Sequence, residues 1–130
     1  MSSLPKPGAV LFAKDLTRMA QFYSSVAGLA VVLSESKLIV LESPLMQLVL
    51  HGMPKRIAES ISITTPPALR ENAAAKLVFP VASLAAARVS ASAVGGGLLP
   101  PKKEFASRGF RACDGNDPEG NVVQFRQHVV

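Results

Sequence analysis

The feature that most constrains the fold is a tight turn over residues 117–121, Asp-Pro-Glu-Gly-Asn, which leads directly into an alternating run over residues 122–126. Proline and glycine inside the turn, flanked by Asp and Asn, are typical of turns that join strands. In the run, Gln124 and Arg126 alternate with apolar residues. This period of two predicts a strand with one polar and one apolar face.

The first half of the chain predicts a strand, a helix and three further strands. Residues 8–13 are an apolar run, and Asp15 is a good N-cap because its carboxylate accepts from the free amides of the next turn. Apolar residues then recur at helical spacing up to Gly28, where a left-handed C-cap would end the helix. The further strands are predicted at residues 30–33, 37–42 and 45–51, the first two as a hairpin.

The second half repeats this βαβββ order. Ser83 takes the capping position of Asp15, and Gly96 lies as far from Ser83 as Gly28 lies from Asp15. This regularity indicates two copies of one unit. The glycines at 95–97 follow a helix, so we interpret them as a helix stop and not as a phosphate-binding loop, which precedes one. The predicted elements are strands at 76–81, 98–101, 108–114 and 121–128 and a helix at 84–94.

We expect one domain. A length of 130 residues has room for a single core. Within residues 1–130, module one spans about 8–52, a proline-containing connecting loop spans 53–72, and module two spans about 73–128.

Composition excludes several classes of function. Apolar residues make up 48% and charged residues 18%, so the chain is globular, and no apolar run approaches the ~20 residues of a membrane span. The first residues lack a signal-peptide pattern, and Cys113 is the only cysteine, which together favour a cytoplasmic location. The net charge of +5 comes from scattered Lys and Arg without interleaved aromatics, which favours a small anionic ligand over nucleic acid. A mean hydropathy of +0.30 indicates an apolar surface that a partner covers.

Four motifs carry a resemblance to a known family. They are Lys14-Asp15-Leu16, Phe22-Tyr23, Gly28-Leu29 and the turn at 117–121, and the resemblance that they carry covers nearly the whole chain, from about residue 8 to 126. The sequence resembles the vicinal oxygen chelate superfamily, which includes glyoxalases, extradiol dioxygenases and bleomycin-resistance proteins. The resemblance implies an α+β fold in which two βαβββ modules curl mixed sheets around a concave cavity. It also implies a homodimer and a small-molecule ligand inside the cavity.

The resemblance places Gly8 and Lys76 where the opening strands of metal-dependent members supply metal ligands. It places Val49 and Gln124 at the matching positions of the closing strands. Gly8 and Val49 have no side-chain donor, a protonated Lys76 repels a cation, and Gln124 alone coordinates weakly. The sequence therefore predicts no metal site and no cofactor.

The period of two also predicts which side chains face the cavity. If Gln124 faces it, Arg126 does too, while Val123 and Phe125 face the helix. A slip of one residue would exchange the two faces. The predicted ligand-binding residues are Phe12, Gln47, Val49, His51, Lys76, Val78, Gln124 and Arg126.

Two of these side chains are candidates for chemistry. Lys76 could hold an anionic group or act as a base, or its ammonium could simply reach solvent along the sheet. His51 is a candidate for proton transfer near neutrality, but its place before Gly52 also fits a solvated strand end.

Other polar residues are interpreted as structural, or have two alternative roles that the sequence does not distinguish. We interpret Asp117 as organising its turn, and because Glu119 lies in the same turn, we do not interpret the two carboxylates as a catalytic pair. Cys113 is interpreted as a small packed residue. Arg111 and Arg126 either pair with a ligand carboxylate at the cavity mouth or are solvated strand arginines.

The sequence thus predicts a metal-independent protein of the bleomycin-resistance type, which binds a partly apolar ligand bearing an acidic or carbonyl group. The alternative is a glyoxalase-like lyase or dioxygenase-like enzyme, which would use an atypical metal site such as His51 with Gln124, or metal-free acid-base chemistry by His51 or Lys76. A third class is an interaction protein with a vestigial cavity.

Overall fold

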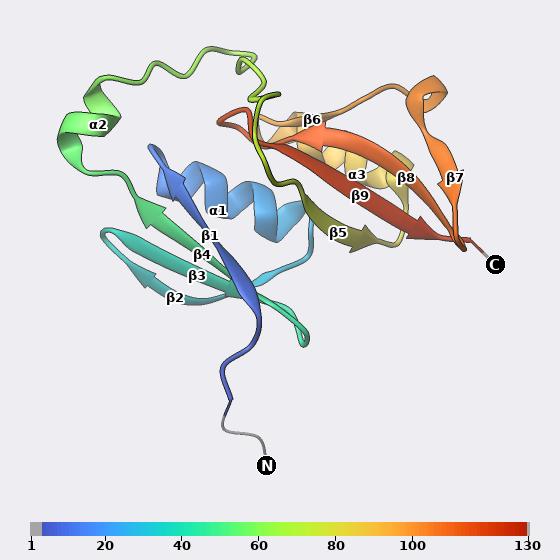
Figure 1. Ribbon diagram of the computed structural model, residues 1–130, viewed down its shortest axis with the longest axis horizontal. Helices are drawn as coiled ribbons and strands as arrows, with labels where there is room; N and C mark the ends of the chain where they lie inside the picture. The colour runs from blue at the N-terminus through green and yellow to red at the C-terminus, as the bar shows by residue number, and fades with distance from the viewer. Residues whose placement is uncertain (1–3, 130) are drawn as a thin grey trace.

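A computed structural model describes residues 4–129 of the chain (Figure 1). Residues 1–3, on which part of the expectation about a signal peptide rests, lie outside the described residues. The first module contains β1 (Gly8–Ala13), α1 (Leu16–Ser25), β2 (Ala30–Glu35), β3 (Leu38–Glu42) and β4 (Gln47–Gly52).

The second module follows a connecting segment that includes α2 (Lys55–Glu59). It contains β5 (Leu77–Val81), α3 (Leu84–Ala93), β6 (Gly97–Leu98), the short 3-10 helix η1 (Pro101–Lys103), β7 (Phe105–Ser107), β8 (Phe110–Asn116) and β9 (Val122–His128).

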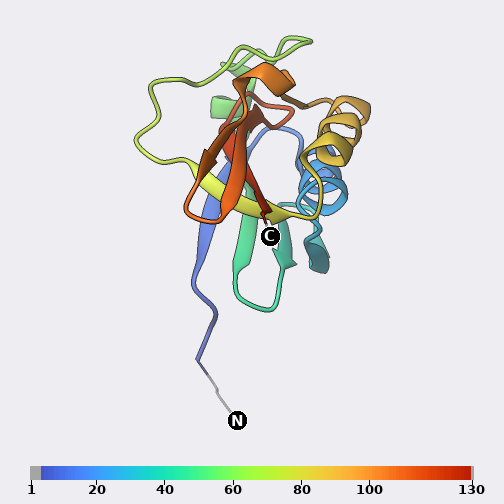
Figure 2. The same ribbon diagram turned by 90° about the vertical axis from the view of Figure 1, so that its right-hand side faces the viewer.

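Each module builds one mixed sheet, and the two sheets have the same plan. Their strand orders are β1-β4-β3-β2 and β5-β9-β8-β6, with β7 paired to β8. The opening strand of each module runs parallel to the closing strand, and the other pairs are antiparallel. The predicted α+β fold of two βαβββ modules is confirmed, although the sheets are not closed into a barrel. Figure 2 shows α1 and α3 on one side of the sheets.

The helices begin and end as the sequence predicts. The Asp15 carboxylate accepts a hydrogen bond from Arg18 N at 3.1 Å, and the Ser83 hydroxyl accepts one from Ala86 N at 3.1 Å. Just beyond the helices, Gly28 and Gly95 have φ values of 71° and 87°. Only glycine adopts this left-handed conformation readily, so both glycines act as helix stops.

Three details differ from the sequence prediction. The connecting loop contains α2, which starts after Pro54, whose fixed φ of −53° suits a helix start. The short strand β7 was not predicted, because three residues carry too little periodicity to stand out. Strand β8 is shifted by two residues, to Phe110–Asn116.

No helix in residues 4–129 has the length and apolar character needed to cross a membrane.

The modules share one core beneath the helices. Phe22 and Tyr23 of α1 are fully buried and pack against the other module: the Phe22 ring centroid lies 6.3 Å from that of Phe125, and Tyr23 lies 5.5 Å from Phe79. A motif of module one therefore packs directly on strands β5 and β9 of module two.

The turn after β8 joins the modules through a second set of contacts, which we call the turn clamp. Glu119, 3% exposed, accepts from the backbone amides of Lys14 at 2.9 Å and of Asp15 at 2.7 Å. Asp117, fully buried, accepts from the Tyr23 hydroxyl at 2.7 Å. The clamp thus ties the two most informative sequence motifs to each other, 104 residues apart along the chain.

Replacing Glu119 by Gln should lower the free energy of unfolding by roughly 1.5–3 kcal/mol, because the amide removes the charge and turns a donor toward buried backbone amides. Urea unfolding measures the change. Glu35→Gln is the matched control, since Glu35 is exposed at the end of β2 and should change stability by less than about 0.5 kcal/mol. Equal stability of Glu119→Gln and wild type would contradict the clamp.

Candidate functional site

The sheets have one face toward the helices and one face away from them, which we call the open face. On β1, Val10 and Phe12 are 55% and 58% exposed, whereas Ala13 is buried. On β9, Val123 and Phe125 are buried in the core, and Gln124 lies opposite Val78 of β5 on the open face. The period-two prediction therefore assigned the faces correctly. All eight predicted ligand-binding residues lie on the open face or at its border.

A chain of polar contacts crosses the open face of module two. Lys76 Nζ donates to Asp114 Oδ2 at 2.8 Å, and Gln124 Nε2 donates to Asp114 Oδ1 at 3.1 Å. Arg126 Nε in turn donates to Gln124 Oε1 at 2.8 Å. These contacts fix which way the Gln124 amide points, and they give the Lys76 charge a partner inside the protein.

Arg126 is further positioned by an aromatic ring. Its guanidinium carbon lies 4.3 Å from the centre of the Phe110 ring, which is cation–π distance. Because only Nε contacts Gln124, the outer edge of the guanidinium has the geometry to bind a carboxylate.

A pocket lies beside this chain, and we call it the head pocket. It has a volume of 540 Å³ and is bounded by the end of the connecting loop, β6, β8 and the start of β9. Its charged lining residues are Arg70, Glu71, Lys76 and Asp114. Lys76 and Asp114 are part-exposed, at 44% and 29%, so their ion pair is open to a ligand.

The structure does not bring all the predicted residues to this pocket. Only Lys76 lines it. Phe12 and His51 lie on the sheet of module one, with ring centroids 5.5 Å apart, and the His51 Nδ1 atom contacts the carbonyl of its neighbour Gly52 at 2.9 Å. Gln47 donates to Glu42 at 2.8 Å. Lys76 therefore lines the head pocket, whereas Phe12, Gln47 and His51 lie on strands of module one.

Sequence reasoning missed Asp114 and Arg70. Asp114 lies directly opposite Gln124 in the β8–β9 pair. The alternation of β9 alone cannot reveal this partner, because it depends on the register of two strands. Arg70 is held by Gly120, whose carbonyl accepts from Arg70 N at 2.8 Å, and this contact has no local sequence signal.

The positions that the resemblance associates with metal do not fit a metal ion. A Cβ atom at Gly8 would lie 2.0 Å from the Gln47 carbonyl oxygen, so this backbone leaves no room for a ligand side chain. Val49 has no donor, and Lys76 is paired with Asp114. Within residues 4–129, no three His, Cys, Asp or Glu side chains are grouped as metal ligands.

The carboxylates of the turn are structural in this geometry. Asp117 Oδ1 accepts from the amides of Glu119 and Asn121 at 2.9 and 3.0 Å. Burial raises the pKa of Asp117, while the bonds from Tyr23 and Asn121 oppose that rise. Burial, followed by the charge of Asp117, also raises the pKa of Tyr23 well above its usual value, so its hydroxyl remains a donor. The predicted turn-organising role of Asp117 is confirmed.

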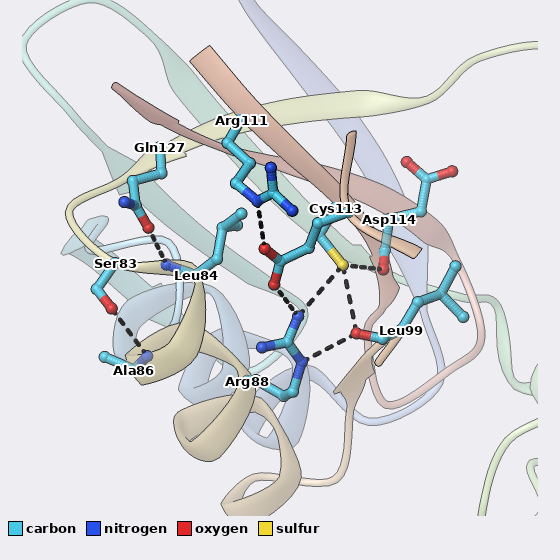
Figure 3. A network of polar contacts seen from close by, with 10 residues as sticks. Ser83, Leu84, Ala86, Arg88, Leu99, Arg111, Cys113, Asp114 and Gln127 are labelled. Carbon is cyan, nitrogen blue, oxygen red and sulfur yellow. Dashed lines mark hydrogen bonds and ion pairs between the residues drawn. The ribbon is translucent and has the colours of Figure 1, made fainter. Parts of the chain in front are cut away.

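On the helix side, Arg88 of α3 is the centre of a second polar network (Figure 3). It donates to Glu104 at 2.6 Å and to the Leu99 carbonyl at 2.9 Å, and Arg111 donates to the same Glu104 at 2.7 Å. Arg111 therefore belongs to this network and does not line the head pocket. Burial raises the pKa of the Cys113 thiol, which fits the predicted packed role.

Comparison with known proteins adds to this description. No family model and no curated protein matches the sequence. A glyoxalase/bleomycin resistance protein/dioxygenase family enzyme from Burkholderia phytofirmans superposes with a TM-score of 0.67 at 17% identity, covering 94% of this chain and 97% of that one. A glyoxalase-related enzyme from Fulvimarina pelagi gives 0.67 at 20% identity, covering 95% and 88%. The fosfomycin resistance protein FosX from Listeria monocytogenes, complexed with Mn(II) and a dihydroxypropylphosphonic acid, gives 0.65 at 15% identity, covering 100% and 94%.

These similarities establish the fold. The chain has the fold of the vicinal oxygen chelate superfamily, as its motifs predict.

The Arg88 network predicts a pH-dependent stability. Arg111 and then Arg88 lower the pKa of Glu104, so the ionised carboxylate stabilises the folded state above the ordinary pKa of a glutamate, and this stabilisation is lost as the pH falls. Glu104→Gln should lower the free energy of unfolding by roughly 1.5–3 kcal/mol at neutral pH, and by clearly less in acid.

Urea unfolding across an acid-to-neutral pH series measures this difference. Glu59→Gln is the control, because the Lys55–Glu59 pair is long, at 3.8 Å, and exposed. If the loss of unfolding free energy in Glu104→Gln is the same at every pH, the charge-based explanation is wrong.

Proposed function

We propose that the protein binds a small, partly apolar organic ligand that carries an anionic group, without a metal ion, and that it acts in the cytoplasm. The observation that carries the proposal is the 540 Å³ head pocket with the open Lys76–Asp114 pair in its wall. A shaped pocket with few charges is what ligand sequestration needs. Cell fractionation tests the location.

The comparisons and the site support this class of function. FosX from Listeria monocytogenes, with the same fold, is complexed with a small organic acid. That protein also holds Mn(II), whereas the donor positions here fit no metal. Of the two candidates for acid-base chemistry, His51 does not line the head pocket, and Lys76 lines it in an ion pair with Asp114 at 2.8 Å, which favours charge contact with a ligand over a role as a base.

Binding of an anion at Lys76 should respond in opposite directions to two substitutions. Lys76→Ala should weaken binding of anilinonaphthalene sulfonate, an apolar anion, by about 1–2 kcal/mol, which allows for the partial exposure of the ammonium. Asp114→Asn should tighten it, because the variant keeps Oδ1 for Gln124 and removes a competing negative charge. Fluorescence titration gives both dissociation constants.

The controls separate charge at this site from general effects. Lys37→Ala removes an exposed lysine of module one and should leave the affinity unchanged. EDTA should also leave it unchanged, and elemental analysis after metal add-back should find less than about a tenth of an equivalent. Near one metal per chain, with binding lost in EDTA, would overturn the metal-independent proposal. Equal affinities of wild type, Lys76→Ala and Asp114→Asn would overturn the role of the pair.

We also propose a homodimer that uses the free edge of β2. This strand is the last of its sheet, and Val31, Val32 and Leu33 are 47%, 54% and 42% exposed. An apolar edge strand with unpaired backbone groups is a template for another strand, and an antiparallel copy of itself supplies a complementary one around a two-fold axis.

Val32→Lys should therefore convert a dimer to a monomer with little change in secondary structure, since a lysine on an edge strand opposes pairing. Light scattering on a size-exclusion column measures the mass. Val89→Lys is the control, because Val89 is 73% exposed on α3, far from this edge in the fold. A wild-type monomer, or a dimer that survives Val32→Lys, would refute this interface.

A further inference from the structure

The head pocket is the first of three adjoining pockets. A second, of 390 Å³, shares Ala73, Ala74, Ala75 and Val122 with it and extends along β1; we call it the seam pocket. A third, of 380 Å³, shares Ala9 and Leu77 with the seam pocket and continues between the starts of β1 and β5; we call it the end pocket. Each pocket therefore adjoins the next through shared lining residues, and we call the series, from module two to the seam between β1 and β5, the pocket line.

Charge is confined to one end of this line. The head pocket has Lys76, Asp114, Arg70 and Glu71 in its wall. The seam and end pockets have no charged lining residue. A ligand that filled the whole line would meet ionic groups at one end only.

The few polar groups of the two inner pockets already have partners. In the seam pocket, the Tyr23 hydroxyl and the Asn121 amide donate to Asp117 at 2.7 and 2.8 Å. In the end pocket, the Ser43 hydroxyl accepts from the amides of Leu45 and Met46 at 3.3 and 3.2 Å. Polar groups on a ligand would therefore add little binding free energy in these two pockets. An alkyl chain there leaves none of these protein groups without its partner.

One segment lines both the head pocket and the seam pocket. It consists of three consecutive alanines, Ala73–Ala75, whose side chains are single methyl groups. On either side, Arg70 is tied to Gly120 and Lys76 to Asp114. The alanines themselves make no hydrogen bond to the sheets among the contacts of the described residues.

From this arrangement we infer that the ligand is a single-chain amphiphile, with a small anionic head in the head pocket and an unbranched alkyl or acyl chain along the β1–β5 seam. The inference rests on the proposed function and narrows its ligand class. Lys76 meets the head, and Ala9 and Leu77 meet the distal part of the chain.

A chain-length series tests the inference. Straight-chain alkanoates from hexanoate to tetradecanoate, kept below their micelle concentrations, compete with anilinonaphthalene sulfonate for the wild-type protein. Affinity should rise about three- to fourfold for each added methylene, because each one leaves water for an apolar pocket. It should then level off at the length that fills the end pocket.

Two variants at the junction of the inner pockets should move that plateau in opposite directions. Ala9→Leu narrows the junction and should bring the plateau to shorter chains. Leu77→Ala widens it and should extend the plateau to longer chains. Urea unfolding of both variants confirms that the fold is intact.

The outcomes separate this inference from the proposed function. Loss of anilinonaphthalene sulfonate binding altogether overturns both. Probe binding with a flat alkanoate series overturns the chain-binding seam alone. Tighter binding of alkyltrimethylammonium than of alkanoate at equal chain length overturns the anionic head.

Discussion

The structure depends on two buried carboxylates in one turn. Burying a charge is expensive unless hydrogen bonds satisfy it. The Glu119 carboxylate accepts from groups at the other end of the chain, whereas Asp117 is satisfied by Glu119 and Asn121 of its own turn and by Tyr23. Glu119 accepts from the amides of Lys14 and Asp15, and Asp117 accepts from Tyr23. Because these partners belong to module one, these hydrogen bonds form only when the modules are docked, which couples the folding of the two halves.

The position of the site follows from this docking. Strand β9 starts directly after the clamped turn, so Gln124 and Arg126 project from a strand whose start is fixed by the clamp. The same docking brings the starts of β1 and β5 next to each other, and the seam and end pockets lie there. The connecting loop is also tied to the turn, because Arg70 binds the Gly120 carbonyl. One set of contacts therefore shapes the head pocket from both sides.

Features that depend on interactions between residues close in the sequence were predictable, and features that depend on distant residues were not. Helix caps at Asp15 and Ser83 and the left-handed Gly28 are local, and all were predictable. Alternation assigned the faces of β1, β5 and β9, since the period of two holds within each strand. The partner of Lys76 was not predictable, because Asp114 lies 38 residues away and reaches it only through the pairing of β8 with β9. The head pocket was not predictable for the same reason, because half of its wall is a loop and long-range contacts determine the path of that loop.

The Lys76–Asp114 ion pair limits how much a charged head group can contribute to ligand affinity in this protein. A free lysine would attract any anion, whereas a lysine already 2.8 Å from a carboxylate gains only the difference between the two partners. The charge of the head group alone therefore gives modest affinity. Most of the binding free energy must come from apolar ligand surface that leaves water. The uncharged seam pocket is where that surface is available, next to the pair and under a segment of small side chains. Selectivity then depends on the length and shape of the apolar part, with the ion pair setting the orientation in which the ligand enters.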